Sequence, residues 1–164
     1  MGSISDIKLR IASASGSVTD RRFGFADLAK TEDVEFIVGD WMSEYNMTTR
    51  GGAKIRSSGA SDEFEDSFLE AIVPALPHLA SRHIKVAVNA GASDTQKLHD
   101  VLVGKIKDAG LDLKVAWVGG DEVMDLVEAA AREGNDFTSL TTGTYQHRRS
   151  VIYGALTRFP QEGN

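Results

Sequence analysis

The chain has 164 residues, a formal net charge of −6 and no cysteine, which excludes disulfides, thiolate nucleophiles and zinc–thiolate sites. No apolar run approaches the ~20 residues that a membrane-spanning helix needs, and no basic patch is large enough to neutralise a nucleic-acid backbone. We therefore expect a cytoplasmic protein that binds neither a membrane nor nucleic acid.

Four apolar stretches predict β-strands in the chain. They lie at residues 7–14 (IKLRIASA), 34–39 (VEFIVG), 84–90 (IKVAVNA) and 113–120 (LKVAWVGG). The third and fourth stretches are rich in β-branched residues and apolar at most successive positions. This pattern is typical of strands that are buried on both faces of a parallel sheet.

Helical spacing of apolar residues appears between and after these strands. It predicts helices at Asp62–Arg82, Thr95–Ala109 and Asp121–Arg132. Pro74 and Pro77 interrupt the first of these, so we expect it to divide into two helices.

The alternation of strands and helices predicts an α/β fold built from βαβ units. We expect an open three-layer Rossmann-like or flavodoxin-like sheet, mostly parallel, with at least four strands and helices on both faces. The Gly/Ser-rich segment Thr48–Glu63 breaks the rhythm and predicts a long mobile loop near the carboxyl ends of the strands. Residues 1–143 form the expected domain, and residues 144–164 form a tail that is either an edge strand or a short helix.

Each predicted strand ends in a loop that carries glycine and polar side chains. In open α/β sheets, ligands bind outside the carboxyl ends of the strands, so we expect a site at this edge. Its candidate residues, in loop order, are Ser15, Gly16, Ser17, Asp20 and Arg21; Asp40, Trp41, Met42 and Glu44; Asn89, Gly91 and Asp94; and Asp121 and Glu122.

Helix capping is the competing explanation for several of these residues. Aspartate is a preferred N-cap, and this preference alone accounts for Asp40, Asp94 or Asp121. Capping does not require Arg21, Trp41 or Asn89, so it explains the four loops together less well than any one of them. Trp41 either covers an apolar ligand or packs against the next helix.

The first loop, SGSVTDR, has two interpretations. It is either an anion cradle, in which backbone amides and an arginine face the ligand, or a plain turn, because it matches neither of the two common phosphate-loop patterns. The histidines lack ligand spacing and no G-x-S-x-G element is present. We therefore expect no metal, no cofactor and no serine-hydrolase chemistry.

Four motifs, SGSVTDR, VGDWMSE, NAGASD and VGGDEV, occur in the order that resembles the acyclic terpene utilisation proteins, a family with a domain of unknown function. The resemblance runs from about Leu9 to Gly143, with Ala92 in place of a family glycine and Glu122 as the second acid of the last motif. It implies the fold and the position of the site, and it connects the chain to terpenoid, acyl-CoA or secondary metabolism. Family members usually continue into a second α/β region, which the tail does not resemble.

The residues favour a cofactor-independent acid/base enzyme of the isomerase, hydro-lyase or cyclase type. Its substrate would be a small terpenoid, polyketide-like or acyl metabolite. Asp40, with Asp121, would transfer the proton, Asn89 would stabilise an oxyanion, and Arg21 would anchor an acidic group.

The alternative is a non-catalytic binding or assembly module that forms half of a two-region site, or a protein that binds an anion or acyl-CoA. We expect a homo-oligomer. A homodimer that closes the loop edge favours the enzyme, whereas a monomer with an exposed apolar face and no pocket favours the module.

Overall fold

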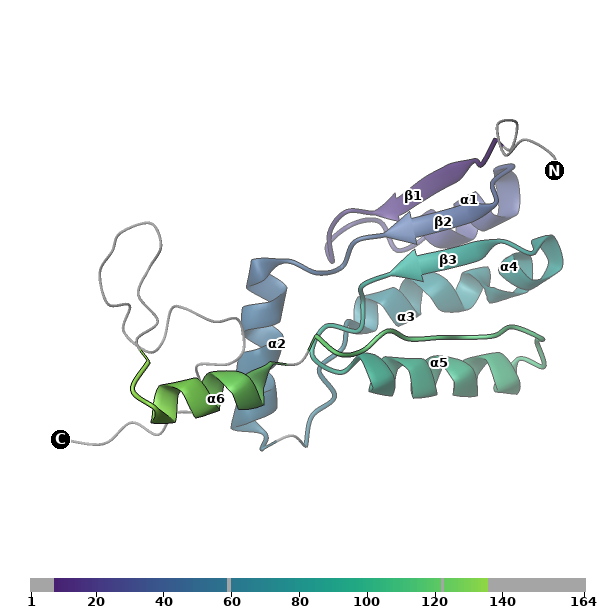
Figure 1. Ribbon diagram of the computed structural model, residues 1–164. Helices are drawn as coiled ribbons and strands as arrows, with labels where there is room; N and C mark the ends of the chain where they lie inside the picture. Colours follow the sequence, from purple (N-terminus) through teal and green to yellow (C-terminus); the bar gives the residue numbers. More distant parts are fainter. Residues whose placement is uncertain (1–7, 59, 122, 136–164) are drawn as a thin grey trace, which may run out of the picture.

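The computed structural model describes residues 8–135 except residues 59 and 122. The sheet has three parallel strands in the order β1 (Ile11–Ser15), β2 (Phe36–Gly39) and β3 (Lys85–Val88) (Figure 1). The α/β class and the first three predicted strands are therefore confirmed. The expected tail, residues 144–164, lies outside the described residues.

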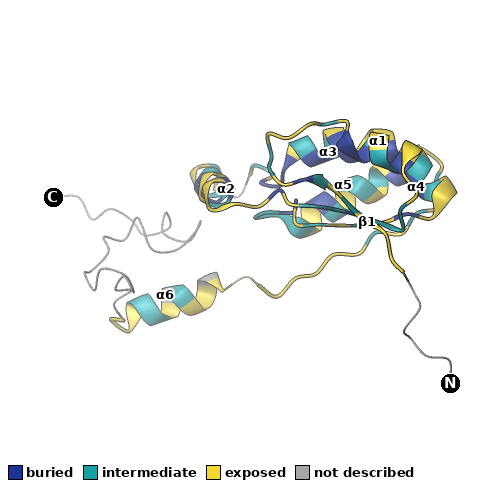
Figure 2. Cartoon of the chain, turned by 90° about the horizontal axis from the view of Figure 1, so that it is seen from above, coloured by how far each residue is buried: buried dark blue, intermediate teal, exposed yellow. Residues whose placement is uncertain are grey.

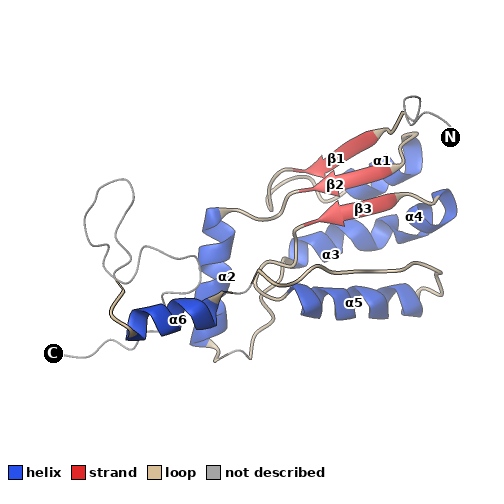
Figure 3. Cartoon of the chain, in the orientation of Figure 1, coloured by secondary structure: helices blue, strands red, loops and turns tan. Residues whose placement is uncertain are grey.

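The described residues also form six α-helices and one short 3-10 helix (Figure 3). They are α1 (Gly24–Thr31), α2 (Glu44–Arg56), α3 (Asp66–Ile72), the 3-10 helix η2 (Val73–Ala75), α4 (Leu76–Arg82), α5 (Thr95–Asp108) and α6 (Met124–Arg132). The break at Pro74 and Pro77 is confirmed, because each proline stands in the first turn of a new helix. No described helix is long and apolar enough to cross a membrane.

The register of the strands decides which side chains share a face of the sheet. Ile37 pairs with Ala12 and Val86, and adjacent residues of paired strands point to the same side. Ile37 is fully buried, and Val86 packs against the same core. This face is the covered one.

The core lies between the covered face and the helices. Phe25 of α1, Phe68 of α3 and Leu76 of α4 belong to one buried cluster with Ile37, and α5 adds Leu98. Figure 2 shows the buried residues gathered on the side where α1, α3 and α4 lie. Right-handed crossovers between strands that follow one another in the same direction place their helices on one face, so this arrangement follows from the strand order.

The structure does not confirm the fourth strand or the second helical layer. Residues 111–120 run in the same direction as β3 in the view of Figure 1, but the described sheet has three strands. Leu113 and Val115 pack against the core, whereas Lys114 and Ala116 are exposed. The segment therefore has the alternating exposure of a strand, but it belongs to no described ladder.

The prediction of a long mobile loop at Thr48–Glu63 is wrong. Residues 48–56 of this segment belong to helix α2, which stands across the carboxyl ends of the strands (Figure 1). The glycine pair that suggests a loop, Gly51 and Gly52, is buried inside this helix. Here tertiary contacts outweigh the low helix propensity of glycine.

Arg10 ties the start of β1 to the start of β2. Its guanidinium forms ion pairs with Asp33 and with Glu35, the latter at 2.5 Å from Nη2 to Oε1, and its backbone N–H donates to Glu35 Oε2 at 2.6 Å. These hydrogen bonds from Arg10 lower the pKa of Glu35 to about 2.

The lowered pKa of Glu35 predicts a dependence of stability on acid. A depressed carboxyl pKa stabilises the fold at pH values above the ordinary value of 4.5, and this contribution disappears as the pH falls to about 2. Glu35→Gln should therefore reduce the loss of stability between these two pH values, measured by denaturant unfolding across the acid range. Asp112→Asn, at an exposed residue without a hydrogen bond to the described part of the chain, is the control and should follow the unmodified protein.

Candidate functional site

The side chain of Asn89, just after β3, connects the loops at the carboxyl ends of the strands. Its Oδ1 accepts the backbone N–H groups of Trp41 at 2.7 Å and Met42 at 3.2 Å, and its Nδ2 donates to Asp40 Oδ1 at 2.7 Å. The Asp40 N–H in turn donates to the carbonyl of Ser15 at 2.9 Å. The structure therefore brings residues of the first three predicted loops together.

Asp40 closes a turn and does not cap a helix. Its Oδ1 accepts the N–H of Met42 at 3.1 Å. Helix α2 begins at Glu44, and Ser43 Oγ accepts the N–H of Asn46 at 3.2 Å, so Ser43 has the N-cap role. The carboxyl group of Asp40 is exposed at the edge of the sheet, where a ligand can reach it.

Trp41 lies in the core, directly behind this exposed edge. It is 2% exposed, and its ring is stacked on Phe25 at 5.6 Å and meets Phe68 edge-on at 5.2 Å between centroids. A Cβ on Gly39 would overlap the indole, so position 39 needs glycine. Trp41 therefore packs in the core, as one of its two interpretations predicts, and a direct contact with substrate stays a prediction. Met42 beside it is exposed.

In the first loop, the chain's own groups use the atoms that an anion would need. The Gly16 N–H donates to Asp20 Oδ2 at 2.8 Å, and Arg21 forms an ion pair with Asp27 at 3.1 Å. The Ser17 N–H donates to Ser15 Oγ at 3.2 Å. This geometry favours the plain turn over the anion cradle.

The fourth loop contributes less to the edge than the sequence predicts. Asp121 is exposed, makes no hydrogen bond or ion pair in the described structure, and precedes α6 by too much to cap it. Glu122 lies outside the described residues. Glu44, the first residue of α2, is exposed and its carboxylate has no hydrogen-bond partner in the described part.

Helix α2 is held against the domain by a polar stripe that the sequence analysis missed. Asn46, Arg50 and Lys54 are spaced four residues apart and so share one side of the helix. Asn46 Nδ2 donates to the carbonyl of Trp41 at 2.8 Å. Sequence patterns search for apolar stripes, and the only available signal here was the i, i+4, i+8 spacing of long polar residues.

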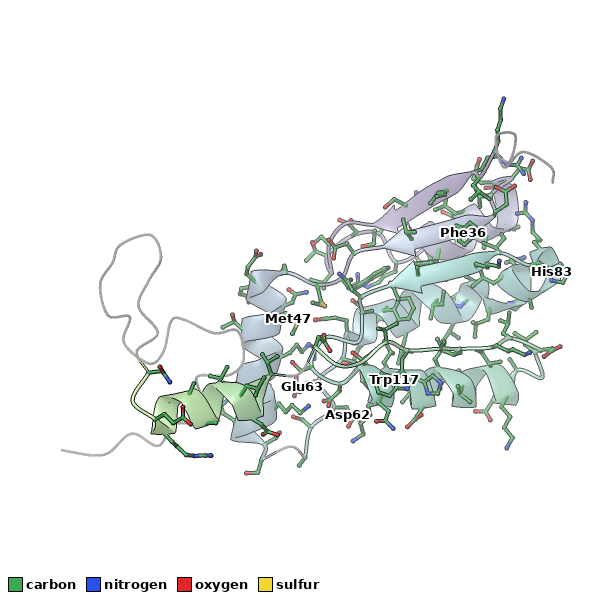
Figure 4. The ribbon with its side chains drawn as sticks, viewed as in Figure 1. Phe36, Met47, Asp62, Glu63, His83 and Trp117 are labelled. Atoms are coloured by element: carbon green, nitrogen blue, oxygen red, sulfur yellow. The ribbon has the colours of Figure 1, made fainter. Side chains whose placement is uncertain are left out.

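Arg50, in the middle of this stripe, contacts two buried carboxylates. Arg50 donates from Nη2 to Glu65 Oε2 at 3.0 Å and lies 3.7 Å from Oε2 of Glu63, which Figure 4 labels beside α2. Both glutamate side chains are almost completely buried. The hydrogen bond to Glu65 is the main cause of the raised pKa of Arg50, so this guanidinium remains charged and compensates the two acids.

The end of α2 is held by the loop after β3. Lys54 Nζ donates to Asp94 Oδ1 at 2.6 Å and to the Ser93 carbonyl at 2.7 Å, and the Glu63 N–H donates to Asp94 Oδ2 at 2.8 Å. Asp94 stands at the N-cap position of α5, but its carboxylate makes these contacts and does not cap that helix. Gly91, in the same loop, is buried against Thr95.

No group of three or more histidine, aspartate or glutamate side chains within the described ranges is arranged to hold a metal ion. The chemistry that remains at the edge is that of an exposed carboxylate beside a primary amide, next to a helix fixed by ion pairs. These features define an α/β domain with a candidate ligand site at the carboxyl ends of its parallel strands.

A family comparison agrees with the order of the loop motifs. The sequence model of the family described as "Acyclic terpene utilisation family protein AtuA" matches residues 9–155. The chain therefore belongs to the acyclic terpene utilisation family. The match continues beyond Gly143 into the expected tail, and the division of the chain at this glycine stays a prediction. No curated protein and no solved structure gives a significant match.

The ion pairs of Arg50 lead to a prediction for the stability of α2. Arg50→Gln removes the charge that compensates Glu63 and Glu65, and an uncompensated buried carboxylate is costly, so the free energy of unfolding should fall by about 2–4 kcal/mol. Amide hydrogen exchange in α2 should accelerate more than exchange in α4. The matched control is Arg56→Gln, at an exposed arginine of the same helix. Equal effects of the two substitutions would contradict the role of the buried pair.

Proposed function

We propose that the chain is a cofactor-independent acid/base enzyme of terpenoid metabolism, with Asp40 as the residue that transfers the proton. The observation that carries this proposal is the hydrogen bond of 2.7 Å between Asn89 Nδ2 and Asp40 Oδ1 at the exposed carboxyl edge of the sheet. It fixes the orientation of a carboxyl group that solvent and ligand can reach. The family description, acyclic terpene utilisation, supports the proposal that the substrate is an acyclic terpene derivative or its acyl thioester.

The contacts of Asp40 suit proton transfer. Both hydrogen bonds that its carboxyl receives reach Oδ1, one from Met42 N–H and one from Asn89, and Oδ2 has no partner in the described structure. An oriented carboxylate with one free oxygen can take a proton from a carbon next to a carbonyl group. Double-bond isomerisation and dehydration of a β-hydroxy carbonyl compound can begin with such a step. Hydration and cyclisation would use the same carboxyl group as a base for water or as an acid for a double bond.

A second candidate function is a binding or assembly module whose site is completed by another region or subunit. The exposure of Asp40 and of Asn89 favours it, since general acid/base catalysis is most effective where water is excluded. For either function, we also propose the finer features that the sequence predicts. These are a fourth strand at residues 113–120, helices on both faces of the sheet, a small-molecule ligand and a cytoplasmic homo-oligomer.

Asp40→Asn tests the enzyme proposal. Asparagine keeps an oxygen for the Met42 N–H and for the Asn89 amide, so the turn should fold normally while the proton-transferring group is lost. The measurement is the rate at which solvent deuterium is incorporated next to the carbonyl group, monitored by NMR for a panel of acyclic terpenoid acids and their CoA thioesters. We expect this rate to fall by ~100-fold or more in Asp40→Asn.

Asp112→Asn is the matched control, because it removes an exposed carboxylate elsewhere and should leave exchange unchanged. Unchanged exchange in Asp40→Asn would remove Asp40 from the mechanism. Binding of panel members without any exchange in the unmodified protein would favour the binding module.

A further inference from the structure

One face of the sheet is uncovered in the described structure. The strand register places Ile11, Phe36 and Lys85 in one row on this face, and Ser13, Val38 and Ala87 in the next. Ile11 is 60% exposed, and the Lys85 ammonium lies over the Phe36 ring at 5.4 Å from its centroid. Parallel sheets in α/β proteins are covered on both faces, so an uncovered apolar face indicates a missing partner. We call these six residues the open face.

Helix α6, with Val123 just before it, has an apolar stripe that no other part of the described structure covers. Val123, Leu126, Val127 and Ala130 follow the i, i+3, i+4, i+7 spacing of one helix side. Leu126 is 71% exposed and Val123 is 49% exposed. Figures 1 and 2 show α6 standing away from its own sheet at the end of residues 111–123.

We propose that α6 of one copy packs on the open face of a second copy, and that the two copies exchange their helices in a symmetric dimer. The open face and the apolar stripe are then the two sides of one contact, made twice. This proposal stands on the sheet and on α6, and it does not depend on the proposed catalytic role of Asp40.

The dimensions of the two surfaces agree. The nine residues of α6 span about 14 Å at 1.5 Å per residue. The strands of four or five residues span roughly 13–17 Å. One helix on one small sheet would bury little area compared with the ~1,200–2,000 Å² of a stable interface, whereas the exchange of two helices forms the contact twice.

Charge also favours the contact. Lys85 lies on the open face, and Lys114 is exposed on the neighbouring segment 111–120. Asp125 is in the first turn of α6, beside the apolar stripe. Basic residues around the open face thus meet an acidic helix start.

The conformation of the connection favours a second copy over the helix's own sheet. Gly120, with φ +107°, stands between residues 111–119 and α6, and the chain leaves the domain there instead of folding back. A connection that carries a helix away from its own sheet is an arrangement from which helices are exchanged between copies.

The first test is the oligomeric state of the full chain by sedimentation equilibrium. We expect a dimer whose dissociation constant rises at least ~10-fold in Leu126→Glu, since a carboxylate in the apolar contact is unfavourable. Val103→Glu is the matched control: Val103 is 41% exposed on α5, outside the proposed contact, and its substitution should leave the dimer intact. A monomeric unmodified chain, or equal effects of the two substitutions, would overturn the proposal.

The second test identifies which chain provides the helix. Because the natural chain has no cysteine, Leu126→Cys and Ala87→Cys can be introduced singly into two proteins of different size and mixed under mild oxidation. We expect a disulfide-linked heterodimer of the two sizes. If the doubly substituted chain instead forms an internal disulfide and stays monomeric, α6 covers its own sheet and the proposal is wrong.

Discussion

The side-chain amide of Asn89 is the interaction on which the carboxyl edge of this sheet depends. One amide group accepts two backbone N–H groups from the loop after β2 and donates to the carboxyl of Asp40. These bonds fix the path of the chain between β2 and α2, and so they fix where Trp41 enters the core and where α2 begins. Asparagine suits this position because it carries both a donor and an acceptor on one planar group.

Helix α2 is also fixed by polar side chains, in this case mainly by ion pairs. Its inner side is polar, and its contacts are made by Asn46, Arg50 and Lys54. A helix held in this way gains less from apolar burial than α1 or α3, and its position depends on complete pairing of Glu63 and Glu65. It stands beside the exposed carboxyl of Asp40, so any change in its ion pairs also changes the surroundings of the candidate site.

The order of the strands determines which face of the sheet the helices cover. Successive strands added in one direction place their connecting helices on one face, which leaves the opposite face of β1, β2 and β3 for another element. The exposed apolar stripe of α6 has the size and character of such an element. In a family connected with terpene utilisation, pairing of two copies would also bring a second set of loops into the same assembly.

The sequence by itself determined the α/β class, the first three strands, the break at Pro74 and Pro77, and the meeting of the first three strand-end loops, because these follow from local periodicity, proline geometry and the topology of parallel sheets. The tertiary structure alone decided that Thr48–Glu63 contributes to a helix, that Trp41 is buried, and that Asp94 binds Lys54 and does not cap α5. The acids that hold α2, Glu63 and Glu65, could not be predicted, since their partner Arg50 is distant in sequence and nothing local marks the pair. Residues 113–120 have the pattern of a strand, but a pattern expresses only the tendency of a segment, and whether the segment joins a sheet depends on backbone hydrogen bonds to a neighbouring strand, which no local pattern specifies.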